Sequence, residues 1–155
     1  MKTLPRYSLL AATAFLAACT GSDMPAEEEG AEAAAETAAE VTPFTVTITG
    51  PTDGAEVAGT EITVTMEASG VTIVPAGELV DGTGHHHIYL DADLGAPGTP
   101  VPTVPNQIIH LGDGSATYTF TDVAPGEHRL IAVVADGMHL PLQPWVVDTV
   151  TFTVR

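Results

Sequence analysis

The chain is predicted to fold as an all-β antiparallel sandwich of seven to eight short strands. Three observations predict it. From residue 44 onward, apolar residues repeatedly alternate with threonine, the pattern of a half-buried strand. Turn signals rich in Gly, Pro and Asp separate these runs at regular spacing. No segment after residue 41 keeps a helical period, so helices are not expected in this part of the chain.

The expected strands follow one another along the domain. Alternating runs occur at residues 44–49 (FTVTIT), 61–67 (EITVTME), 116–120 (ATYTF) and 150–154 (VTFTV). Residues 130–134, LIAVV, are apolar on both faces, which is typical of a central strand. This pattern indicates an immunoglobulin-like architecture, without the Cys-Trp-Cys pattern of true immunoglobulin domains. Residues 94–107 contain four prolines and two glycines, so they are expected to form an extended connection rather than a central strand.

Residues 1–18 have the three zones of a secretory signal peptide. Lys2 and Arg6 supply the positive charge, an apolar run of about eleven residues follows, and small residues end the segment. This run is shorter than the roughly 20 residues that a membrane-spanning helix needs.

The signal ends in LAAC, which resembles the lipobox of bacterial lipoproteins. The resemblance implies that Cys19 becomes the lipidated first residue of the mature chain and anchors it to a membrane of the cell envelope. Because Thr20 follows the cysteine rather than aspartate, the implied location is the outer membrane, facing the periplasm. The alternative is an ordinary signal peptide cut near Ala18, which leaves Cys19 a free thiol.

Residues 19–42 are rich in Ala and Glu and contain almost no large apolar residue, which predicts a disordered, flexible tether. The chain carries 20 Asp and Glu against four Lys and Arg. This balance argues against nucleic-acid binding, which depends on basic residues that neutralise phosphates. The single cysteine leaves no internal disulfide. Residues 43–155 are therefore expected to form one monomeric domain that is held together by its apolar core.

Three consecutive histidines begin the expected strand GHHHIYLD. Because side chains alternate faces along a strand, His86 should share the core-facing side of Ile88, whereas His85 and His87 point the other way. Residues two apart on one face lie about 7 Å from each other, close enough for two imidazoles to converge on one metal ion. His85 and His87 are therefore a candidate chelating pair. The alternative is surface exposure or hydrogen bonding.

A stable metal site needs further ligands, and the candidates by sequence are His110, His128 and His139, with Asp91, Glu127 and Asp136 as nearby carboxylates. Of these, His110 or His139 is expected to complete the site. Imidazole nitrogens suit copper or zinc, and Met138 beside His139 adds a thioether that favours copper(I). Four other residues are expected to be structural or to support the ligands: His86 in the core, His128 at a turn where it bonds to a backbone carbonyl, and the carboxylates Asp91 and Asp136.

A series of short motifs is similar to an uncharacterised bacterial exported family, the domain of unknown function 4399. The motifs are PAG at 75–77, GHHHIYLD at 84–91, HLGDG at 110–114, PGEHRL at 125–130 and HLP at 139–141. Members of that family are typically exported, and the resemblance implies no established activity. The family pattern ends in His-x-Pro-His, but Leu142 stands where the second histidine would fall. If that histidine is a ligand, the site here would be incomplete.

Two classes of function follow. The first is a lipid-anchored binding module of the cell envelope whose histidine cluster holds copper or zinc. The second is a non-metal structural or interaction module that contacts an envelope protein or a glycan through Trp145 and residues 94–107. An enzyme is not expected, because no nucleophile motif is present and the only lysine, Lys2, belongs to the signal. A metal-dependent enzyme is the remote third alternative.

Overall fold

The computed structural model describes residues 42–155, which contain nine strands. The strands are β1 (Thr45–Gly50), β2 (Ala55–Val57), β3 (Ile62–Ser69), β4 (Thr72–Ile73), β5 (Thr83–Leu90), β6 (Ile108–Leu111), β7 (Thr117–Phe120), β8 (Gly126–Ala135) and β9 (Val147–Val154). The signal peptide, Cys19 and the tether up to residue 41 lie outside the described residues. No helix that could cross a membrane occurs in the described part.

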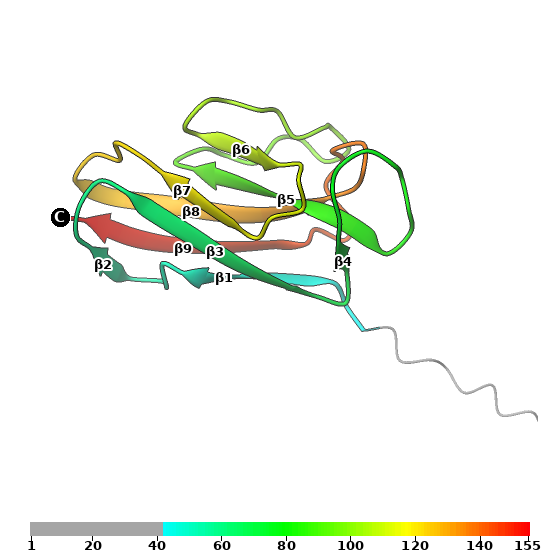
Figure 1. Ribbon diagram of the computed structural model, residues 1–155, viewed down its shortest axis with the longest axis horizontal. Helices are drawn as coiled ribbons and strands as arrows, with labels where there is room; N and C mark the ends of the chain where they lie inside the picture. Colours follow the sequence, from blue (N-terminus) through cyan, green and yellow to red (C-terminus); the bar gives the residue numbers. More distant parts are fainter. Residues whose placement is uncertain (1–41) are drawn as a thin grey trace, which may run out of the picture. The chain divides into compact units, whose positions relative to one another are not determined.

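The strands form two sheets that pack as a sandwich (Figure 1). The smaller sheet has the order β1-β3-β7, and both of its pairings are antiparallel. The larger sheet has the order β2-β9-β8-β5, and both β4 and β6 pair with β5. The predicted immunoglobulin-like sandwich is therefore confirmed, with nine strands rather than seven to eight. The short strands β2 and β4 have too few residues to show an alternating pattern, and both pair in parallel.

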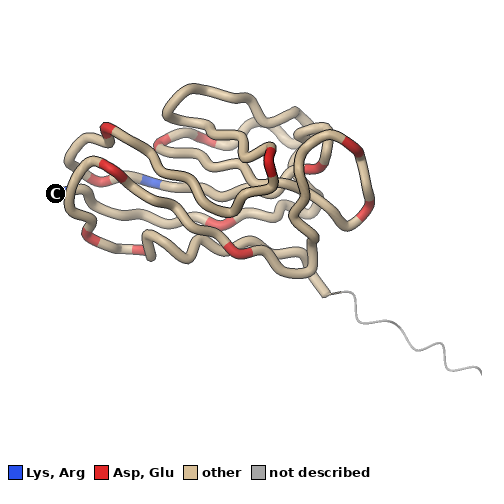
Figure 2. The backbone as a smooth tube through the Cα atoms, viewed as in Figure 1, with Lys and Arg blue, Asp and Glu red and all other residues tan. Residues whose placement is uncertain are grey.

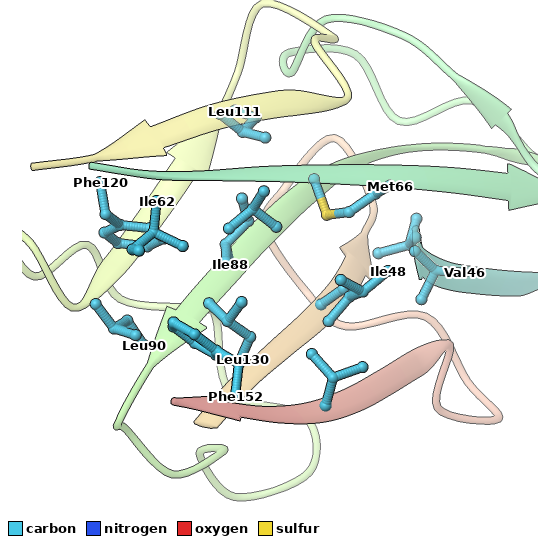
Figure 3. Packing of buried hydrophobic residues seen from close by; sticks show 14 of the residues in the cluster. Val46, Ile48, Ile62, Met66, Ile88, Leu90, Leu111, Phe120, Leu130 and Phe152 are labelled. Carbon is cyan, nitrogen blue, oxygen red and sulfur yellow. The ribbon is translucent and has the colours of Figure 1, made fainter. Parts of the chain in front are cut away.

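The main core lies between the two sheets (Figure 3). In β1 and β3 the apolar members of the alternating pattern, such as Ile48 and Val64, are buried, and most of the threonines between them face solvent. Strand β8 is buried on both faces from Leu130 to Ala135, as its continuous apolar run predicts. Removing this apolar surface from water is the main driving force for the fold, since the described residues include no cysteine.

A second apolar cluster covers the outer face of the larger sheet. Tyr89, Ile131 and Val133 point to this face, opposite to the main core, and pack with residues from the proline-rich segment. Val101 lies in that segment and is buried, and its backbone N–H donates to the carbonyl of His139 at 2.8 Å. The proline-rich residues therefore form a cover over the sheet. Trp145 is partly buried against the same cluster.

Acidic residues lie at many positions around the domain (Figure 2). The basic residues of the described part are Arg129 and Arg155, and each is paired with a carboxylate. Arg129 donates to Asp93 at 2.6 Å, and Arg155 donates to Glu56. The described part of the chain therefore carries a net negative charge.

Candidate metal centre

Four histidine rings gather at one end of the larger sheet. His85 and His87 come from β5, His110 from β6, and His139 from the turn after β8. The β5–β6 register places His87 opposite His110, and the β5–β8 register places His85 opposite Ala135, the last residue before that turn. As a result, the six centroid separations among the four rings range from 4.6 to 5.8 Å.

The Nε2 atoms of these rings face one another in two pairs. His87 Nε2 lies 3.0 Å from His85 Nε2, and His139 Nε2 lies 3.2 Å from His110 Nε2. A tetrahedral ion with ligand bonds of 2.0–2.1 Å sets its nitrogens about 3.3 Å apart, so both pairs are close to that spacing. One nitrogen from each of His85, His110 and His139 forms a group whose members all lie within 4.8 Å of one another. These three histidines can therefore hold one ion, and His87 is not a member of this group.

The two histidines that β5 contributes to the cluster are buried, in contrast to the surface position that alternation alone would allow. His85 is 1% exposed and His87 is 0% exposed, and the Nδ1 atom of each ring has no hydrogen-bond partner. An unpaired buried polar atom costs about 1–3 kcal/mol, and native proteins contain few of them. Nε2 of His86, on the other face of β5, is also buried without a partner, so all three consecutive histidines carry this cost, which an apolar side chain in the same space would avoid.

The electrostatics of the cluster keep its buried rings neutral. Burial, followed by repulsion from His110 and His139, lowers the pKa of His85 from 6.5 to about 4, although Asp136 opposes the shift. Burial, followed by repulsion from the other three histidines of the cluster and from His86, lowers the pKa of His87 to about 3. Burial and His139 also lower the pKa of His110, against the opposing charge of Asp113. A neutral imidazole has the free lone pair that a metal ion requires.

His139 occupies a strained turn that Asp136 holds in place. The φ angle of His139 is 67°, a left-handed conformation that residues other than glycine rarely adopt. Oδ1 of Asp136 accepts hydrogen bonds from the N–H groups of Met138, at 2.8 Å, and Leu140, at 3.0 Å, on either side of this histidine. Strained backbone that is fixed in this way is typical of functional sites. Met138, which the sequence offered as a soft ligand, is 59% exposed.

Two glycines that sequence reasoning did not single out permit the close packing of the cluster. A Cβ on Gly112 would lie 2.6 Å from Nε2 of His110, so the imidazole lies directly over this glycine. A Cβ on Gly137 would lie 2.6 Å from the carbonyl carbon of Glu78, so the β4–β5 loop packs against the His139 turn. The β4–β5 loop and the turn after β8 lie at the same end of the sandwich (Figure 1). The HLGDG and DGMH motifs carry these glycines, but spacing alone does not show what each one contacts.

His86 lies on the opposite face of β5 and does not join the cluster. It is 1% exposed, on the side of the strand that carries Ile88 and Leu90 into the main core. Its Nδ1–H donates to the carbonyl of Ser115 at 3.1 Å. This position agrees with the structural role expected from alternation.

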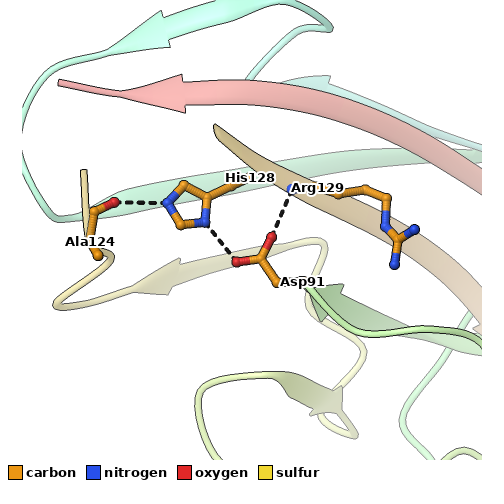
Figure 4. A network of polar contacts seen from close by, with 4 residues as sticks. All are labelled: Asp91, Ala124, His128 and Arg129. Atoms are coloured by element: carbon orange, nitrogen blue, oxygen red, sulfur yellow. Dashed lines mark hydrogen bonds and ion pairs between the residues drawn. The ribbon is translucent and has the colours of Figure 1, made fainter. Parts of the chain in front are cut away.

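His128 and Asp91 form a separate polar network at the start of β8 (Figure 4). Nδ1 of His128 donates to Oδ2 of Asp91 at 2.7 Å, and Nε2 donates to the carbonyl of Ala124 at 2.8 Å. Asp91 also accepts the N–H of Arg129 at 2.9 Å. Burial lowers the pKa of His128, but these hydrogen bonds outweigh it and raise the pKa overall. Both ring nitrogens are engaged in fixing this corner, so neither is free to bind a metal.

Leu142 does not stand at a vacant ligand position. It packs against the main core between the sheets, and its N–H donates to the carbonyl of Val134 at 3.0 Å. The histidine cluster lies on the other face of the larger sheet, with Tyr89 and Val133. A histidine at position 142 would therefore point away from the cluster. The departure from the His-x-Pro-His pattern leaves the four-histidine group intact.

The chain belongs to the family described as Domain of unknown function (DUF4399), which matches residues 64–155 and so includes all four histidines of the cluster. No curated protein matches the chain.

The solved structures that match part of the chain include two of low sequence identity. One is an engineered protein with 16% identity and a TM-score of 0.42; the match covers 74% of this chain but only 21% of that protein. The other is the CARDB domain of the PF1109 protein from Pyrococcus furiosus, solved in complex with di-metal ions. It has 21% identity and a TM-score of 0.38, over 76% of this chain and 97% of that domain.

Proposed function

We propose that this protein is a lipid-anchored binding module of the cell envelope that holds one copper or zinc ion through His85, His87, His110 and His139. The observation that carries the proposal is the pairing of four Nε2 atoms at 3.0 and 3.2 Å in a partly buried cluster. Four neutral nitrogen donors match the preference of zinc and of copper(II) for imidazole.

The geometry favours a ligand function over simple architecture. A hydrogen bond between two neutral imidazoles satisfies one N–H and one lone pair, but it leaves both Nδ1 atoms of the buried pair unsatisfied. Two apolar side chains would fill the same space without that cost. The left-handed backbone of His139 adds a second strain at the same place. A bound metal ion would supply a favourable interaction that offsets the cost of the unsatisfied Nδ1 atoms and the cost of the backbone strain at His139.

The proposed role is binding rather than catalysis. A site with four protein ligands is closed, as in structural or carrier centres, whereas catalytic zinc keeps one position open for water. The proposed anchor at Cys19 and the outer-membrane location facing the periplasm rest on the lipobox-like LAAC sequence. The negative field of the domain would concentrate cations around it.

Isothermal titration of the purified protein with zinc and with copper(II) tests the proposal. We expect one ion per chain with micromolar or tighter affinity. The His85→Ala/His87→Ala pair and the His110→Ala/His139→Ala pair should each abolish binding. The second pair removes half-exposed side chains, so it tests the site even if the buried pair does not fold. X-ray absorption at the zinc edge should show only nitrogen donors at about 2.0 Å.

His128→Ala is the matched control, because it removes a histidine from the corner network without touching the cluster. It should lower stability and leave zinc affinity unchanged. Absence of zinc and copper binding in the parent protein would show that the histidine pairs are hydrogen-bonded architecture, as in the alternative non-metal module of the envelope.

A further inference from the structure

The two half-exposed histidines of the cluster each belong to a turn that an aspartate closes. His110 is followed by a turn in which Oδ1 of Asp113 accepts the N–H of Ser115 at 2.9 Å. His139 lies in the turn in which Oδ1 of Asp136 accepts the N–H groups of Met138 and Leu140. In each turn one oxygen of the aspartate carboxylate accepts hydrogen bonds from backbone N–H groups. The negative charge of that carboxylate therefore lies in the same turn as the histidine.

Only two of the four histidines in the cluster are accessible to solvent. His85 and His87 are at most 1% exposed, whereas His110 and His139 are both partly exposed. The solvent-exposed side of the cluster is therefore formed by the two outer histidines, whose turns contain Asp113 and Asp136.

The carboxylates of Asp113 and Asp136 affect the net charge of the site when it holds an ion. Four neutral imidazoles add no charge, so a bound ion keeps its full positive charge in a partly buried place. The two arginines of the described part are paired with Asp93 and Glu56 and do not neutralise Asp113 or Asp136.

We propose that Asp113 and Asp136 make the histidine centre favour a divalent ion over a monovalent one. This inference rests on the proposed metal site and names the class of its ion: zinc(II) or copper(II) rather than copper(I). Coulomb energy is proportional to the charge of the ion, so each carboxylate stabilises a divalent ion by twice as much as a monovalent ion at the same position. Met138, the residue that could favour copper(I), is largely exposed on the outer side of the turn.

Asp113→Asn and Asp136→Asn test the proposal with little change of shape. Asparagine keeps an Oδ1 that accepts the same backbone hydrogen bonds, so each substitution removes only the charge. Zinc(II) and silver(I), an air-stable monovalent probe, are titrated into the purified protein at low ionic strength. Each variant should bind zinc about tenfold more weakly and silver about threefold more weakly. The double variant should show about the square of each factor, and the losses should shrink at high salt.

Asp53→Asn is the matched control. Oδ1 of Asp53 also holds a backbone N–H, that of Thr151, at 2.8 Å. Thr151 pairs with Arg129, six residues along β8 from the partner of His85, which corresponds to about 20 Å. This variant should bind both ions like the parent. Equal fold-losses for zinc and silver in the Asp113 and Asp136 variants, or no loss, would overturn the inference while leaving the metal site in place. Failure of the parent protein to bind either ion would overturn the proposed site itself.

Discussion

The imidazole of His110 lies across Gly112, and a Cβ at position 112 would come to 2.6 Å from its Nε2 atom. Nε2 of His110 lies 3.2 Å from Nε2 of His139. The His110 ring can therefore occupy this position only because residue 112 is a glycine and has no side chain. Gly112 sits in the turn between β6 and β7, and the three heavy atoms nearest to a Cβ at this position all belong to the His110 ring.

Gly112→Ala is expected to weaken zinc binding at least about tenfold with a small change in stability, because the added methyl displaces the His110 ring from the cluster. Calorimetric titration and thermal unfolding of the same samples measure the two effects. Gly95→Ala is the control, since a Cβ there meets only Thr99 Oγ1 at 3.2 Å. Unchanged zinc affinity in Gly112→Ala would show that the ring position seen here is not the binding position.

His139→Gly and His139→Ala should both lose the ion but differ in stability. Both remove the imidazole, while only glycine adopts the left-handed φ of 67° without strain. Without metal, the glycine variant should be more stable than the alanine variant by about 1 kcal/mol. Chemical denaturation in the presence of a chelator measures this difference. Equal stability of the two variants would contradict the assignment of backbone strain to this position.

The metal-free protein should lose stability as pH falls below about 6.5, the ordinary pKa of histidine. The folded pKa is about 4 for His85 and about 3 for His87. Between these values and 6.5 the unfolded chain binds protons that the folded chain excludes, so the unfolding free energy falls as pH decreases. Each histidine contributes a slope of up to about 1.4 kcal/mol per pH unit, and the stabilisation is complete above pH 6.5.

Urea unfolding with chelator between about pH 7.5 and about pH 4.5 measures this slope. His128 acts in the opposite direction: its raised pKa gives stability that is complete below about 6.5 and is lost as pH rises through the folded pKa. A His128→Ala background should therefore show a steeper net loss on acidification. A flat profile in that background would contradict the low pKa of the buried pair.

Leu142→His should not strengthen metal binding, although it restores the family pattern at that position. The side chain at 142 packs against the main core, so an imidazole there should lower stability by about 1–2 kcal/mol. Zinc titration and thermal unfolding check both parts, with Leu142→Gln as a polar control that lacks a ligand nitrogen. Tighter zinc binding in the histidine variant alone would place position 142 in the site.

Much of the fold could be predicted from local pattern. Alternation in β1, β3 and β9 identified the faces that are buried, and the continuous apolar run of β8 identified a central strand. The short strands β2 and β4 escaped prediction because they have only three and two residues. The covering role of the proline-rich segment also escaped, because its Val101 shows no periodicity and becomes buried only against the second apolar cluster.

Local sequence is enough to place His85 and His87 on one face of β5 and His86 on the other, because side-chain alternation is a local property of any strand. It also supplied His110 and His139 as candidates, but by residue type alone. Tertiary structure decided which histidines meet. The antiparallel registers of β5 with β6 and β8 bring residues 85, 110 and 139 together across long stretches of chain, and they leave His128 in a separate corner. Register depends on the packing of whole strands, so no short motif could reveal it.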